Sequence, residues 1–239
     1  MKIDQERCTG CGQCLPYCPV KAISMDSDLA RIDFDECAEC GSCLRMAACP
    51  GDAIYQQEME WPRIIRSVLS NPLTVAVESG IPGRGTEEMK TNEVTGRFKL
   101  GQVGIGIEVG RPITGTRLYD VEKVAQAVAG LGVEFEKINP TTSLMSDTRT
   151  GKFKDEILNE KVLSAILEFS LKIERLPEVF PVLEKVAGQI DSVFSLVVAT
   201  RIRPDGSVPT APYVETSGLW IAPNGKTNVG LGRPLIKED

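Results

Sequence analysis

The sequence contains no histidine, and it contains no cysteine after Cys49. Without histidine, the chain lacks a common general base, a common zinc or haem ligand and the usual pH switch. No apolar run is long enough to span a bilayer, and no apolar signal region follows Lys2. These absences predict a cytoplasmic protein without a membrane span, in which a scaffold of disulfide bonds is not expected.

The chain has 239 residues, of which 42% are apolar and 25% charged, as in ordinary globular proteins. Its net charge of −6 comes from residues 1–60, which hold five Lys or Arg against eleven Asp or Glu. Such an acidic segment repels nucleic acid and could steer a basic protein partner into place. Alternatively, these scattered acids only keep a small domain soluble.

All eight cysteines lie in two runs that almost repeat each other. The first is Cys8-x2-Cys11-x2-Cys14-x3-Cys18-Pro19, and the second is Cys37-x2-Cys40-x2-Cys43-x5-Cys49-Pro50. Each run continues x-x-Ala-Ile. An internal duplication of this kind predicts two related half-units around a pseudo-twofold axis.

The spacing suits an iron–sulfur cube, which needs four thiolates. Three of them can come from one tight loop. Gly10 and Gly12 in the first run and Gly41 in the second allow positive φ and a close approach of the backbone to the cluster. Zinc sites usually pair two C-x2-C knuckles or use histidine, and disulfide scaffolds belong to exported chains. The pattern therefore favours iron–sulfur clusters over both alternatives.

Residues 1–57 resemble the bacterial-type 2[4Fe–4S] ferredoxins through "CTGCGQCLPYCPVKAI" and "CAECGSCLRMAACPGDAI". The resemblance implies two [4Fe–4S] clusters, in which the Cys-Pro cysteine of each run binds the cluster of the other run. It assigns one cluster to Cys8, Cys11, Cys14 and Cys49, and the other to Cys37, Cys40, Cys43 and Cys18.

The second run departs from the family pattern by its longer x5 segment. If Cys49 binds the other cluster, this segment closes no ring on one cube, and it can bulge at little entropic cost. We expect Arg45 and Met46 to lie outside, and the two clusters to differ in exposure.

The remainder predicts an α+β protein with a connector at 58–72, containing a short helix after Pro62, and a second domain at 73–239. In that domain, period-two alternation predicts strands at 102–110, 133–139, 161–174 and 191–202, and helical spacing predicts helices at 116–132 and 175–190. This βαββαβ order is typical of a four-stranded antiparallel sheet with both helices on one face. It resembles ACT-like and ferredoxin-like split-βαβ domains in topology only.

Three functions are compatible with these patterns. The favoured one is an electron carrier that passes single electrons to or from an oxidoreductase with a basic docking surface, with no nucleic acid and no membrane as partner. The C-terminal domain would dock that partner or form a homo-oligomer. The alternative is a redox- or metabolite-sensing regulator that binds a small anion at a polar loop with Arg84, Lys90 and Arg97, although a solvated connecting loop is the favoured explanation of these cations. An enzyme subunit comes third, because no catalytic constellation is visible.

Overall fold

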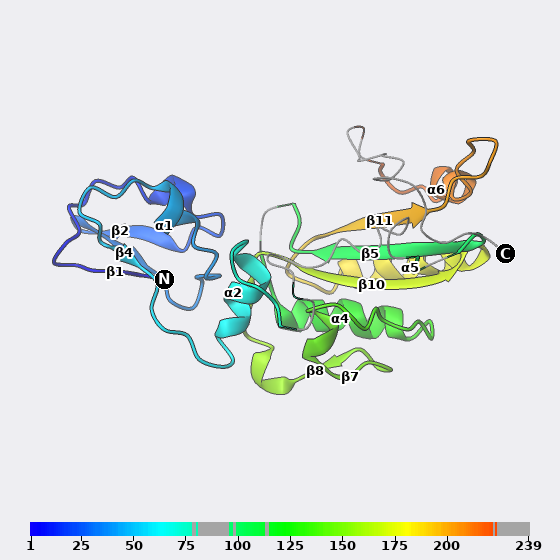
Figure 1. Cartoon of the computed structure of the whole chain (residues 1–239), viewed down its shortest axis with the longest axis horizontal. Helices are drawn as coiled ribbons and strands as arrows, with labels where there is room; N and C mark the ends of the chain where they lie inside the picture. The colour runs from blue at the N-terminus through cyan, green and yellow to red at the C-terminus, as the bar shows by residue number, and fades with distance from the viewer. Residues whose placement is uncertain (78–79, 81–95, 98, 113–114, 222, 224–239) are drawn as a thin grey trace.

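The computed structural model describes residues 1–77, 80, 96–97, 99–112, 115–221 and 223. The cysteine-rich module forms one end of the molecule, and helix α2 lies between it and the larger sheet domain (Figure 1). The α-helices are α1 (Ser42–Met46), α2 (Ile64–Ser70), α4 (Leu118–Ala129), α5 (Leu176–Ala187) and α6 (Ala211–Glu215). The strands are β1 (Lys2–Ile3), β2 (Ile23–Asp26), β3 (Leu29–Ile32), β4 (Ile54–Tyr55), β5 (Gln102–Val109), β6 (Thr116–Arg117), β7 (Met145–Asp147), β8 (Lys152–Phe153), β9 (Lys161–Val162), β10 (Ala165–Lys172) and β11 (Phe194–Thr200).

The N-terminal module is built from two antiparallel strand pairs, β1 with β4 and β2 with β3. The same backbone hydrogen bond ends each pair. The N–H of Asp4 donates to the carbonyl of Ala53, and the N–H of Asp33 donates to the carbonyl of Ala22, both at 2.8 Å. A small core that includes Ile23 and Ile54 lies between the two halves. The duplication in the sequence is therefore a duplication of structure.

The larger domain is centred on an antiparallel sheet with the order β10-β5-β11. Every second residue of β5, beginning at Val103, is fully buried in the main core, as are Leu167 and Phe169 of β10. Helices α4 and α5 contact each other and contribute to the same core. The alternating apolar residues of the strands and the periodic apolar residues of the helices thus pack into one hydrophobic layer, and its burial stabilises the domain.

The second predicted strand, 133–139, is reduced to one antiparallel bridge between Phe135 and Phe169. The N–H of Glu136 still donates to the carbonyl of Glu168, but the carboxylate of Glu136 accepts from the N–H of Ile138. Just past the segment, the amide oxygen of Asn139 accepts from the N–H of Thr141. Such bonds compete with a strand ladder. The sheet thus has three strands and this bridge where we predicted four strands. The fold is mixed α+β, as predicted, while the βαββαβ topology remains a prediction.

The predicted helix after Pro62 is present as α2. No helix within the described ranges is long and apolar enough to cross a membrane.

Candidate metal centre

Two cysteine loops leave the strand pairs along matching paths. The N–H of Cys8 donates to the carbonyl of Asp4 at 3.0 Å, and the N–H of Cys37 donates to the carbonyl of Asp33 at 3.1 Å. Gly12 and Gly41 occupy equivalent places after the second cysteine of each loop, and both have φ of +68°. Because glycine adopts this left-handed conformation without strain, both loops can turn their cysteines inward.

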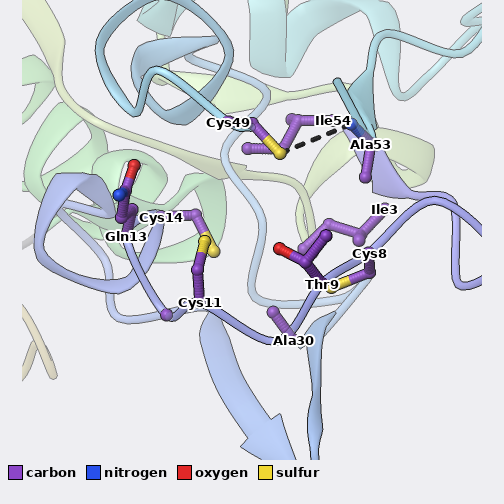
Figure 2. Close-up of a pocket in the computed structure, with 11 residues that line it drawn as sticks. Ile3, Cys8, Thr9, Cys11, Gln13, Cys14, Ala30, Cys49, Ala53 and Ile54 are labelled. Atoms are coloured by element: carbon purple, nitrogen blue, oxygen red, sulfur yellow. Dashed lines mark hydrogen bonds between the residues drawn. The ribbon is translucent and has the colours of Figure 1, made fainter. Parts of the chain in front are cut away.

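The two Cys-Pro corners also match in structure. The N–H of Ala22 donates to the sulfur of Cys18 at 3.1 Å. The N–H of Ala53 donates to the sulfur of Cys49 at 3.4 Å, the bond drawn as a dashed line in Figure 2. Hydrogen bonds of this kind stabilise negative charge on sulfur and contribute to cluster potential. The shared Cys-Pro-x-x-Ala motif therefore positions a thiol and supplies its donor.

One cavity of the module brings cysteines of both runs together. Cys8, Cys11 and Cys14 of the first run line it together with Cys49 of the second, and Figure 2 shows their sulfurs around a common space. The rest of the wall is largely apolar and contains Ile3, Ala30, Ala53 and Ile54. We call these four cysteines the distal set. Four thiols in an apolar wall with a backbone donor fit the requirements of a [4Fe–4S] cluster.

The other four cysteines, the proximal set, are Cys18, Cys37, Cys40 and Cys43. The last three are buried, whereas Cys18 is partly exposed. Burial raises the pKa of the Cys43 thiol to about 12, and the nearby thiols of Cys40, Cys37 and Cys18 add to the effect. Cys18 of the first run thus lies in the electrostatic environment of the second loop.

Burial likewise raises the pKa of Cys14, to which Cys11, Cys8 and Cys49 contribute. Among the described residues, no three candidate side chains are placed to hold a single metal ion. A cube differs from such a site because its four thiolates bind separate irons. The positive charge of the irons would deprotonate these thiols on binding.

The second loop is held by cations that sequence analysis did not identify as site residues. The guanidinium of Arg66, only 3% exposed, donates to the carbonyl of Cys37 at 2.9 Å and forms an ion pair with Glu160. Arg45 in α1 donates to the carbonyl of Cys40 at 2.8 Å. Arg45 and Met46 are both exposed, as expected, and Arg45 in addition reaches back to the loop.

Acidic residues before Cys37 face the sheet domain. Arg117 pairs with Asp35 at 2.7 Å and with Glu36 at 2.6 Å, and Lys161 also pairs with Glu36. The Arg117 guanidinium lowers the pKa of Asp35 below its usual range, and Lys161 followed by Arg117 does the same for Glu36. Part of the acidic surplus of residues 1–60 is therefore neutralised within the chain.

A fully buried carboxylate lies within the second loop itself. Glu39, between Cys37 and Cys40, pairs with Arg63 and with the amino group of Met1. Burial works to raise the pKa of Glu39, but these cations and Gln56 outweigh it and lower that pKa. No local motif marks Glu39 or Arg66 as site residues, because their partners are distant in sequence.

Of the cations in the predicted anion loop, the described residues include one. Arg84 and Lys90 lie outside the described residues. Arg97 is described, and it forms an ion pair with Glu136.

The paired thiol loops and their backbone donors place the chain among iron–sulfur proteins. In agreement, residues 1–24 match the family model described as "4Fe-4S binding domain". The matched residues include all four cysteines of the first run, from Cys8 to Cys18. No curated protein and no solved structure matches the chain. The chain is thus an iron–sulfur protein with a 4Fe-4S binding domain at residues 1–24, a class in which clusters carry electrons.

Proposed function

We propose that this protein carries two [4Fe–4S] clusters and passes single electrons to or from a partner oxidoreductase. The main evidence for this proposal is the structural repeat of the two cysteine loops. Matching backbone hydrogen bonds start both loops, and matching N–H donors reach the Cys-Pro sulfurs of both. The second cysteine loop therefore has the same local backbone geometry as the loop that the family match supports.

In this proposal the distal set binds one cluster and the proximal set binds the other. Each cluster supplies reversible one-electron chemistry when bound. The protein chain fixes the thiols, donates N–H bonds to Cys18 and Cys49 and surrounds the sulfurs with apolar residues such as Ile3 and Ile54. These features limit water at the clusters and contribute to their potentials.

The domain arrangement belongs to the proposal as well, with a module at 1–57, a connector at 58–72 and a split-βαβ domain from 73. The Phe135–Phe169 bridge adds to the outer side of β10 and gives the order 135, β10, β5, β11. Together with the two helices of one core, this order supports the βαββαβ topology. We propose that this domain helps to dock the oxidoreductase, whose contact surface is basic.

Anaerobic purification followed by iron and acid-labile sulfide analysis tests the cofactor content. We expect about eight irons and about eight sulfides per chain, and reducible [4Fe–4S] signals in electron paramagnetic resonance (EPR) spectra. Half that content in a fully folded chain would contradict the second cluster.

Two serine variants test the ligand assignment. Cys49→Ser should disturb the cluster of the first run, and Cys18→Ser the cluster of the second, because the Cys-Pro ligands are exchanged. EPR spectra of each variant, compared with those of Cys11→Ser and Cys40→Ser, check this. If Cys49→Ser matches Cys40→Ser instead, each run binds its own cluster.

A further inference from the structure

The two cysteine sets differ in how the chain covers them. In the distal set, Cys11 is exposed, Cys8 and Cys49 are partly exposed, and only Cys14 is buried. In the proximal set, Cys37, Cys40 and Cys43 are 7–8% exposed, and only Cys18 is partly exposed. Because both loops follow the same local path, their own backbone does not explain this difference. Its cause lies in the segments that pack on the second loop.

The first of these segments is the connector. Arg66 of α2 reaches the carbonyl of Cys37, and Asn71, just after α2, accepts a hydrogen bond of 3.0 Å from Arg45. A Cβ added to Gly41 would lie 2.5 Å from the Arg45 guanidinium and 3.7 Å from the Asn71 side chain. The corresponding Gly12 has nothing within 4 Å of such a Cβ. The connector therefore covers the second cysteine loop at Gly41, whereas the first loop is open at the equivalent Gly12.

The second covering segment comes from the sheet domain. Leu163, between β9 and β10, packs with Cys40 and Ala38 in a buried apolar cluster, to which Val20 adds. A Cβ added to Gly115, before β6, would lie 2.9 Å from the side chain of Val20. The sheet domain thus packs closely against the module beside Cys40.

Ion pairs hold these surfaces together. We define the interface clamp as Asp35 and Glu36 of the module with Arg66, Arg117 and Lys161 of the connector and sheet domain. The side chains of Arg66, Arg117 and Lys161 are at most 18% exposed, whereas their partners Glu36 and Asp35 are 39% and 69% exposed. The cations are therefore buried at the interface, and the acids lie at its edge.

We propose that the interface clamp makes the proximal cluster a protected centre, which soluble iron chelators reach only when the clamp opens, while the distal cluster is open to them. This inference rests on the proposed function, because it assumes a cluster in each cysteine set. It assigns the sheet domain a second role as the shield of one cluster, independent of any docking role.

Chelation with trapping of the released thiols tests the proposal. The fully loaded protein is incubated anaerobically with EDTA and iodoacetamide, and mass spectrometry follows alkylation of each cysteine over time. Thiols react only after their cluster is lost, so the alkylation rates report on access to each cluster. We expect Cys8, Cys11, Cys14 and Cys49 to be alkylated at least about tenfold faster than the proximal set, because the proximal set needs a local opening.

Variants of the clamp establish the cause. Lys161→Met and, separately, Arg117→Gln should raise the alkylation rate of the proximal set towards that of the distal set and leave the distal rate unchanged. Arg149→Met is the matched control, because its side chain is 91% exposed and lies outside the clamp. Circular dichroism confirms that each variant is folded.

The outcomes separate the two proposals. Equal alkylation rates of all eight cysteines in a protein with two clusters would overturn the proposal that the clamp protects the proximal cluster. An alkylation rate of the proximal set that neither clamp variant changes would overturn it as well. A folded protein that binds fewer than two clusters contradicts the proposed function, and iron and sulfide analysis detects this before the chelator is added.

Discussion

The guanidinium of Arg66 donates a 2.9 Å hydrogen bond to the carbonyl of Cys37, across 29 positions of the sequence. The same side chain pairs with Glu160, a further 94 positions along the chain. One buried arginine therefore joins the second cysteine loop, the connector and the sheet domain. A planar guanidinium can serve several acceptors in this way because its five N–H donors are held in a fixed fork.

Replacement of Arg66 by lysine tests this arrangement. Lysine keeps the charge but cannot reach the backbone carbonyls and Glu160 together, so we expect Arg66→Lys to lower the free energy of unfolding by about 1–3 kcal/mol. Anaerobic denaturant titration of the loaded protein measures this. Arg31→Lys, in an exposed pair with Asp26, is the control and should change stability by less than about 1 kcal/mol. Equal effects of the two changes would show that the hydrogen bonds of the Arg66 guanidinium add no stability beyond that of an exposed ion pair.

Glycines of the first loop make a second test, because two of them have almost the same φ but different surroundings. A Cβ at Gly10 would lie 2.0 Å from the carbonyl oxygen of Asp28, whereas a Cβ at Gly12 meets nothing within 4 Å. Gly12→Ala should lower the free energy of unfolding by about 1–2 kcal/mol, because alanine is strained in the left-handed conformation but meets no other atom there. Gly10→Ala should cost more and reduce iron content, because the backbone must move away from Asp28. Denaturant titration and iron analysis of both variants check the order, which is wrong if Gly12→Ala is the more damaging change.

The path of the two cysteine loops could be predicted from the sequence because their geometry is local. The spacing of the cysteines, and glycines such as Gly12 and Gly41, set the path of the chain within a few residues. The resemblance to two-cluster ferredoxins predicts the exchange of Cys18 and Cys49 between clusters, which stays a prediction. The structure shows that Cys49 lines the same cavity as Cys8, Cys11 and Cys14.

The interface clamp could not be predicted, because no pattern in the sequence pairs Glu36 with Lys161 at a separation of 125 positions. The acidic surplus of residues 1–60 suggested either an external basic partner or mere solubility. The structure adds an intramolecular use for Asp35 and Glu36. Likewise, alternation predicted a strand at 133–139, but period two says nothing about side chains such as Glu136 and Asn139 that capture neighbouring N–H groups.

The buried carboxylate of Glu39 leads to a third prediction. Glu39→Gln removes the negative charge that faces Arg63 and the amino group of Met1 but keeps the size of the side chain. Because an uncompensated buried cation is costly, we expect a loss of about 3–5 kcal/mol in the free energy of unfolding. Asp26→Asn breaks the exposed pair with Arg31 and should cost less than about 1 kcal/mol. Thermal unfolding of both variants under anaerobic conditions compares them, and a similar small loss in each would mean that Glu39 is not a structural ion-pair partner.

Proline 181 gives the last prediction, since it lies inside α5 with its side chain exposed. It has no N–H to donate to the carbonyl of Pro177, four residues earlier, and its ring crowds that carbonyl. Pro181→Ala restores the donor without removing buried packing, although alanine also makes the unfolded chain more flexible. Because a proline inside a helix costs about 3 kcal/mol and the added flexibility offsets about 0.4–1 kcal/mol, we expect a net gain of about 2 kcal/mol in stability. Denaturant titration measures the gain, and the visible absorption of the clusters should be unchanged because α5 belongs to the sheet domain. A loss of stability would mean that α5 depends on the fixed φ of proline more than on the missing hydrogen bond.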